Sequence, residues 1–202
     1  MTNEHGILFS APMVQAILDG SKTMTRRIVK PQPPSDWSDS PGAVRVEQIG
    51  GEWEYLYNHV STDEILHIAY WPIGFGPYGA PGGLLNVREA WATYRAFDSL
   101  KPSELKPSCS IHYLADTDKP AWPIGKTRAS IHMPRWASRL TLRLTGVRVE
   151  RLQAITEADA QAEGVESVDK YRELWNALNA RHGYPWESNP WVWCLTFKRV
   201  EV

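Results

Sequence analysis

Residues 20–27, Gly20-Ser21-Lys22-Thr23-Met24-Thr25-Arg26-Arg27, concentrate hydroxyl and cationic side chains in eight positions. No acid lies among the four cations between Lys22 and Lys30. Apolar residues recur at helical spacing over 11–19, and Gly20 stands where a left-handed residue would end that helix. A loop that leaves a rigid helix holds its side chains in fixed directions. We therefore expect a cationic loop that binds an anionic or carbonyl-bearing ligand.

The mixture of residue types in this segment suggests chemistry as well as binding. A desolvated Lys22 supplies a base near the potential oxygen nucleophile Thr25. Arg26 and Arg27 are suited to holding a phosphate or an oxyanion. The alternative is a solvated cationic surface, which is the common fate of such clusters.

The overall composition indicates a globular protein without a generally basic surface. The chain has 202 residues, 43% hydrophobic residues and ten tryptophans, which suits one large domain or a domain with insertions. Lysine and arginine number 22 against 23 acids, for a net charge of -1. Any nucleic-acid contact must therefore come from a local patch, and a small ligand such as a nucleoside is equally compatible.

Neither a cofactor nor a metal is indicated by the sequence. Cys109 and Cys194 lie far apart and form no metal-binding or disulfide pattern, and the six histidines show no paired spacing. Residues 1–10 lack the features of a signal peptide, and no apolar stretch is long enough for a membrane span. We expect a protein of the reducing cytoplasm, with no membrane partner.

The order of patterns predicts an α+β domain with two excursions. Residues 35–82 are rich in glycine, proline, serine and tryptophan and are expected to carry a hairpin, and 95–110 form a second excursion. Strands are expected at 6–10, 44–49, 53–59, 84–94, 111–115, 140–144, 147–152 and 191–198, with Gly146 marking a bend or bulge. Aromatic residues of the excursions could stack on a base, although core packing is the alternative: Trp53, Trp71, Tyr78 and Trp122.

Two helices are expected in the C-terminal half. Thr156 is placed to cap the first, which should run to Glu163 and end at Gly164. The second should span 167–182, and its stripe at 171, 174, 175 and 178 is expected to be core. The closing strand at 191–198 should be central to a sheet.

Two further charged residues are candidates for substrate binding. Glu89 is an acid on an otherwise apolar strand, so it is either a site residue or the partner of a cation. Arg135 lies in a segment that interleaves cations with Trp136, a composition suited to contacting a base and a phosphate.

With these residues placed, the chain resembles the ASCH family, a group similar to the PUA RNA-binding domains. The family pattern G-x-K-x-x-T-x-R is met by Gly20, Lys22, Thr25 and Arg27 directly after a helix, and Glu163 matches the family's functional glutamate. The strand expected over 84–91 and the ending 189–198 are similar to longer ASCH proteins common in bacteriophage and prophage genomes. The resemblance implies a PUA-like β-barrel with flanking helices, as one domain over 1–202 with insertions at about 35–75 and 95–125.

The resemblance also implies an activity. The small members that act as N4-acetylcytidine amidohydrolases use a lysine, a threonine and a glutamate, which correspond to Lys22, Thr25 and Glu163. The implied reaction hydrolyses an exocyclic amide of a modified cytidine without a metal. We expect Lys22 to act as a base toward Thr25 or a water, although a nearby Glu163 carboxylate opposes the loss of its proton.

Two alternatives to this activity remain open, which makes three hypotheses in all. Lys22 and Glu163 could form a structural ion pair in a pocket that only binds a base. The chain would then be a non-catalytic RNA- or nucleotide-binding module. A ribonuclease that uses the same cationic cleft is the third possibility.

Overall fold

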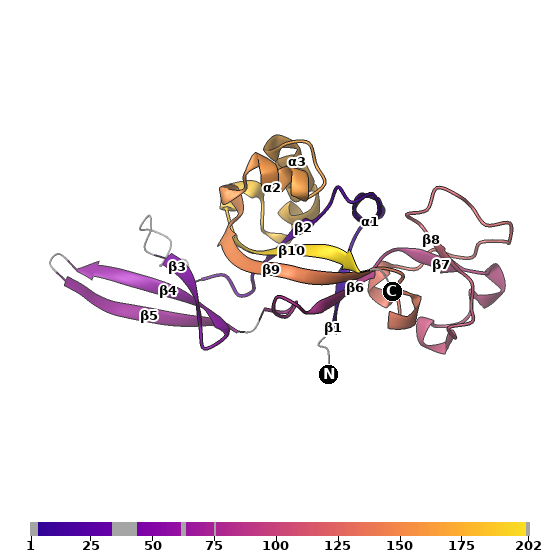
Figure 1. Ribbon diagram of the computed structural model, residues 1–202, viewed down its shortest axis with the longest axis horizontal. Helices are drawn as coiled ribbons and strands as arrows, with labels where there is room; N and C mark the ends of the chain where they lie inside the picture. The colour runs from indigo at the N-terminus through magenta and orange to yellow at the C-terminus, as the bar shows by residue number, and fades with distance from the viewer. Residues whose placement is uncertain (1–3, 34–43, 62–63, 75, 201–202) are drawn as a thin grey trace.

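The computed structural model describes residues 4–33, 44–61, 64–74 and 76–200. Its centre is a five-stranded sheet in the order β1-β6-β9-β10-β2 (Figure 1). These strands are β1 (Glu4–Leu8), β2 (Met24–Ile28), β6 (Leu84–Arg88), β9 (Thr141–Arg151) and β10 (Trp191–Val200). Strand β1 pairs with β6 in parallel, whereas the other neighbours are antiparallel.

Strand β10 organises the core because both of its faces are buried. Trp193, Leu195 and Phe197 join the main apolar cluster, whereas Val192 and Cys194 join the cluster under the C-terminal helices. Successive side chains of a strand point to opposite faces, so a nearly continuous apolar run can serve two layers. The predicted central position of this strand is confirmed by its pairing with both β9 and β2.

Three helices flank the sheet: α1 (Ala11–Leu18), α2 (Glu157–Ala162) and α3 (Val168–Asn179). Figure 1 shows α2 and α3 together over one face of β9 and β10. The glycines expected to end helices at 20, 164 and 183 all have a positive φ, of 84°, 84° and 86°. The prediction that the last helix runs to 182 is wrong in one detail, since residues 180–182 form a 3₁₀ turn.

The capping arrangement predicted for α2 is confirmed. The Thr156 hydroxyl accepts a hydrogen bond from the Asp159 amide, and the Asp159 carboxylate accepts one from the Thr156 amide. The predicted bulge in β9 is also present. The pairing with β10 shifts register so that Thr196 lies opposite Gly146 and Phe197 opposite Leu144.

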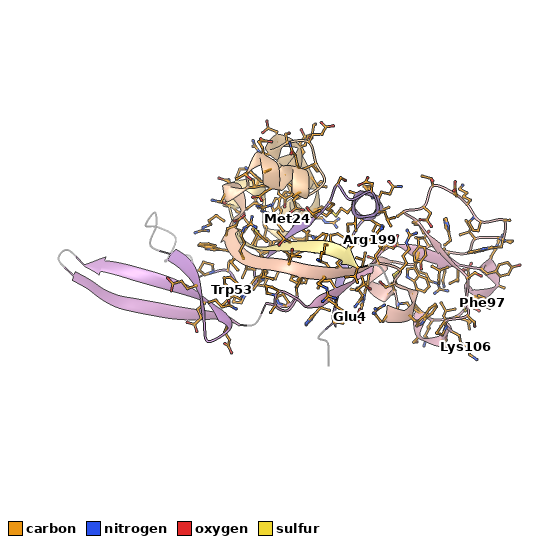
Figure 2. All side chains as sticks on the ribbon, viewed as in Figure 1. Glu4, Met24, Trp53, Phe97, Lys106 and Arg199 are labelled. Atoms are coloured by element: carbon orange, nitrogen blue, oxygen red, sulfur yellow. The ribbon has the colours of Figure 1, made fainter. Side chains whose placement is uncertain are left out.

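The first excursion forms a separate antiparallel sheet, β3-β4-β5, that extends away from the central sheet (Figure 1). Its strands are β3 (Val44–Ile49), β4 (Glu52–Ser61) and β5 (Glu64–Gly74), so the expected hairpin is present with a third strand that the sequence pattern does not predict. Trp53 lies where this sheet joins the core (Figure 2), with its ring 5.8 Å from that of Trp193. The side chain of Trp71 lies outside the described part of the structure.

Two predictions about chain path are wrong. The expected single strand over 84–94 is split, because β6 belongs to the central sheet and β7 (Trp91–Thr93) pairs with β8 (Ile111–Tyr113). Alternation continues through the break at 89–90, so periodicity alone could not reveal the change of partner. Half of the expected cationic loop over 20–27 is strand, since Met24 to Arg27 lie on β2 and pair with β10.

The architecture is therefore α+β, as expected, but the pairing of the described strands does not form a closed barrel. The order begins with β1 and ends with β2, and no backbone ladder joins these two edges. Within the described ranges, every helix is too short or too polar to cross a membrane.

Candidate functional site

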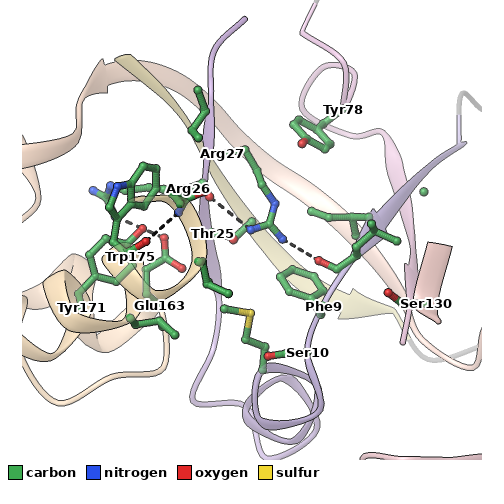
Figure 3. Close-up of a pocket in the computed structure, with 18 of the residues that line it drawn as sticks. Phe9, Ser10, Thr25, Arg26, Arg27, Tyr78, Ser130, Glu163, Tyr171 and Trp175 are labelled. Carbon is green, nitrogen blue, oxygen red and sulfur yellow. Dashed lines mark hydrogen bonds and ion pairs between the residues drawn. The ribbon is translucent and has the colours of Figure 1, made fainter. Parts of the chain in front are cut away.

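A cavity of about 650 Å³ lies between the two edge strands of the sheet and helix α3 (Figure 3). Its lining comes from residues 6–10 around the end of β1, residues 25–28 of β2, Glu163 and the face of α3 over 171–179. Met13 of α1, together with Tyr78, Ala90 and Ser130 from three separate connections, completes it. This size falls within the range of small-molecule sites in proteins.

The conformation of the chain after α1 explains why Lys22 meets Glu163. The Lys22 amide donates to the Ala16 carbonyl, and the Thr23 amide donates to the Ala162 carbonyl, each at 2.8 Å. The short segment before β2 is thereby held against the end of α2. Gly164 allows this approach, since a Cβ there would lie 3.3 Å from that of Lys22.

Lys22 and Glu163 form a buried ion pair. The Lys22 ammonium donates to Glu163 Oε2 and to the Glu163 carbonyl oxygen, each at 2.7 Å. The residues are only 2% and 4% exposed. Burial lowers the pKa of Lys22 below its ordinary value, although the Glu163 carboxylate opposes this shift.

The two oxygens of Glu163 have different environments. Oε2 is held by Lys22, whereas Oε1 is buried without a hydrogen-bond partner in the described part of the chain. The Arg26 guanidinium lies 3.8 Å from Oε1, as an ion pair without a hydrogen bond. Glu163 lines the cavity and Lys22 does not, so the carboxylate stands between the lysine and any ligand.

Arg26 is anchored by carboxylates on its other side. Its Nη2 donates to Glu150 Oε1 at 2.7 Å and to Asp159 Oδ2 at 2.8 Å, and Arg148 bonds to the same two acids. The side chain is fully buried, although the residue contributes to the cavity wall. Arg26 is therefore a fixed charge beside Glu163, and its orientation is set by the protein itself.

Arg27 occupies a different position, across the cavity. Its Nη2 donates to the Leu8 carbonyl at 2.8 Å and its Nη1 to the Arg26 carbonyl at 3.4 Å (Figure 3). The guanidinium lies over the ring of Phe9, 5.1 Å from its centre. Because Leu8 ends β1 and Arg27 lies on β2, this side chain bridges the two edges of the sheet.

Thr25 lines the cavity with Arg26 and Arg27 and is 1% exposed. The structure therefore brings the predicted residues Thr25, Arg26, Arg27 and Glu163 to one cavity, with Lys22 directly behind Glu163.

Glu89 and Arg135 do not line this cavity. Glu89 is 1% exposed and accepts two hydrogen bonds from Arg139, at 3.0 and 3.1 Å, which matches the alternative of a partner cation. Burial raises the pKa of Glu89 despite this contact. Arg135 is half-exposed and pairs with Glu4 at 2.6 Å.

The sequence did not identify most of the apolar lining. Tyr171 and Trp175 are buried as predicted but also line the cavity. Leu174 and Leu178 of the same stripe line it as well, and Leu178 is 43% exposed. An amphipathic stripe is the same whether it faces core or a ligand cavity, so its pattern contains no further signal. Of the aromatic candidates, Tyr78 lines the cavity, whereas Trp53 packs on Trp193 and Trp122 on Tyr94.

Among the described residues, no group of three or more histidine, cysteine or acidic side chains is placed to hold a metal ion. Both cysteines are free thiols, and that of Cys194 is buried against Glu150.

Comparison with known proteins does not establish a family. No protein-family model and no curated protein matches the sequence. A crystal structure of protein EF3133 from Enterococcus faecalis V583, described under the family model DUF984, aligns with 99% of this chain and 82% of its own. The identity is 12% and the TM-score 0.40, which is too weak to establish a common fold.

Proposed function

We propose that this protein is an amidohydrolase that cleaves the exocyclic amide of N4-acylated cytidine or a related modified nucleoside. The observation that supports the proposal most is the environment of Glu163. Its Oε2 accepts a hydrogen bond from the buried Lys22, whereas its Oε1 has no hydrogen-bond partner among the described residues. The residue lines a nucleoside-sized cavity together with Thr25. A buried, unsatisfied acceptor at a cavity is costly to maintain unless a ligand or water satisfies it.

The arrangement suggests a division of roles. Thr25 positions a water against the amide carbon, and Glu163 accepts the proton of that water as it attacks. The carbon–nitrogen bond then breaks as Glu163 returns the proton to N4, which yields cytidine and the free acid. Lys22 keeps the carboxylate oriented and compensates its charge. Arg26 adds positive charge close to the developing oxyanion.

The resemblance to the ASCH and PUA-like proteins supports the same proposal. The Arg27 side chain joins the edge strands β1 and β2 where a barrel would have to close. We therefore extend the proposal to a PUA-like fold in which β1 and β2 are not joined by backbone hydrogen bonds. The Arg27 side chain and the ligand cavity take the place of that ladder.

A non-catalytic base-binding module is the second candidate. It is favoured by one observation, namely that the Lys22 ammonium already makes two short hydrogen bonds and has no exposed surface. A lysine held in this way resembles a structural ion pair.

A hydrolysis assay separates the two candidates. The protein is incubated with N4-acetylcytidine, and release of cytidine is followed by chromatography. We expect turnover by the wild type, and a loss of about 100-fold or more in kcat for Glu163→Gln and Thr25→Val. No turnover together with binding of cytidine would favour the non-catalytic module. Degradation of an added RNA would instead indicate a ribonuclease.

The exposed pair Lys170 and Glu173 provides matched controls. These residues form an ion pair on the outer surface of α3, away from the cavity lining. Lys170→Met and Glu173→Gln remove the same functional groups as Lys22→Met and Glu163→Gln. The two control variants should retain wild-type kcat and KM.

A further inference from the structure

Arg27 differs from Arg26, the other arginine that lines the cavity, because it has no carboxylate partner among the described residues. Three cations nearby form ion pairs: Lys22 with Glu163, Arg26 with Glu150 and Asp159, and Arg148 with Glu150 and Asp159. Arg27 instead donates to two main-chain carbonyl oxygens. Its positive charge is therefore left uncompensated in a partly buried position.

Two side chains with hydroxyl groups, Tyr78 and Ser130, line the cavity together with Arg27. Burial raises the pKa of Tyr78. The charge and hydrogen bonding of Arg27 oppose this rise, because the two side chains interact. Ser130 lines the same cavity. In Figure 3, Tyr78 and Ser130 lie on the far side of Arg27 from Glu163 and Trp175. Arg27 and these two hydroxyl groups therefore lie toward one end of the cavity, and the Glu163 carboxylate lies toward the other.

We propose that Arg27, Tyr78 and Ser130 form an anion subsite that takes the phosphate monoester of a mononucleotide whose base reaches Glu163. This inference rests on the proposed function, since it makes the substrate of the same cavity a nucleotide. A guanidinium and two hydroxyls supply donors to several oxygens of a phosphate, which accepts strong charge-assisted hydrogen bonds. The bound phosphate would compensate the charge of Arg27.

A mononucleotide fits these observations better than an RNA strand. Affinity for a nucleic-acid backbone comes from several cations that each contact a phosphate. Among the described lining residues, a single cation without a carboxylate partner faces the cavity, and the enclosed volume of about 650 Å³ suits one small molecule.

Calorimetric titration with cytidine, cytidine 5′-monophosphate and inorganic phosphate tests the subsite directly. We expect the monophosphate to bind about tenfold or more tightly than cytidine, in line with one charge-assisted contact. Arg27→Gln should abolish that advantage and leave the affinity for cytidine within about threefold. Inorganic phosphate should compete with the monophosphate in the wild type and not in Arg27→Gln.

Two further variants separate the subsite from folding. Because Arg27 also bridges to Leu8, thermal unfolding is measured for every variant. Tyr78→Phe leaves that bridge intact and should weaken the monophosphate several-fold. Arg143→Gln removes an exposed arginine on β9 and should change neither affinity.

Several results would overturn the proposal: equal binding of cytidine and its monophosphate, no binding of either, or an advantage that survives in Arg27→Gln. Tighter binding of an oligoribonucleotide than of the monophosphate would assign the subsite to RNA instead. The proposed function is tested separately, because hydrolysis of N4-acetylcytidine involves no phosphate.

Discussion

The Lys22 ammonium lies 2.7 Å from Glu163 Oε2, although the two residues are 141 positions apart in the sequence. Both charges are buried. Burial of either charge without the other would be costly, because an unpaired charge loses its hydration without compensation. The ion pair thereby joins the segment after α1 to the end of α2, next to the cavity.

The first prediction concerns the energy of this pair. Lys22→Met leaves the buried Glu163 carboxylate with the Arg26 guanidinium, 3.8 Å away, and without its close partner, and should lower the free energy of unfolding by about 3–5 kcal/mol. The double variant Lys22→Met/Glu163→Leu should recover a large part of that loss, since it removes both charges. Urea unfolding of the two single variants and the double variant gives the interaction energy. Additive effects in this cycle would show that the pair contributes no coupling.

The second prediction concerns Gly164, which follows Glu163 in the sequence and packs against Lys22. An added Cβ would lie 3.2 Å from Ala16 Cβ and 3.3 Å from Lys22 Cβ, at a φ of +84°. Gly164→Ala should therefore combine a backbone cost of about 1–2 kcal/mol with displacement of Lys22 and loss of turnover.

Gly183→Ala is the matched control for this substitution. Gly183 has a φ of +86° with no atom within 4 Å of the added Cβ, so only the backbone cost should appear. The two variants are compared by urea unfolding and by kcat. Equal effects on both would mean that the contact with Lys22 is unimportant.

The third prediction concerns acid stability. Burial disfavours ionisation of Glu150 and Asp159, but hydrogen bonds from Arg148 and Arg26 outweigh it and hold the pKa of both carboxyls below their ordinary values of 4.5 and 3.8. Below those values the unfolded chain binds more protons than the folded protein, so the free energy of unfolding should fall as the pH decreases. This stabilisation is fully present above about pH 4.5 and is lost as the pH falls through the lower folded-state values.

Urea unfolding at intervals from pH 6 to pH 3 measures this dependence. Asp159→Asn removes one of the two carboxyls and should give a shallower fall than the wild type over the same interval. An unchanged slope would mean that Asp159 does not contribute to acid sensitivity.

The fourth prediction concerns the outer wall of the cavity. Leu178 lines it while remaining 43% exposed, so Leu178→Ala should change the free energy of unfolding by less than about 1 kcal/mol. The same variant should raise KM several-fold, because it removes apolar contact with a ligand. Leu100→Ala, at a leucine of 36% exposure that does not line the cavity, should leave KM unchanged. Steady-state kinetics on both variants decide the point.

Local chemistry in the sequence was sufficient to predict several elements. Thr156 and Asp159 cap a helix through contacts three residues apart, and Gly20 and Gly164 end helices through their own conformational freedom. The apolar run of β10 predicts a central strand for the same local reason, since only a strand buried on both faces tolerates it.

Tertiary structure decided the changes of strand partner and the assembly of the cavity. The pattern over 84–94 does not show that the strand changes partner at residues 89–90. The stripe of α3 does not distinguish the buried Trp175 from Leu178, which is 43% exposed, although both line the cavity. The lining combines Leu8, Arg27, Tyr78 and α3, which are brought together only by packing over long separations.

By itself, the sequence determined which residues could do chemistry. The fold determined that Glu163 faces the cavity, that Lys22 lies behind it, and that Arg27 is left without a carboxylate partner among the described residues. The reason is that burial and ion pairing depend on neighbours that local patterns do not specify.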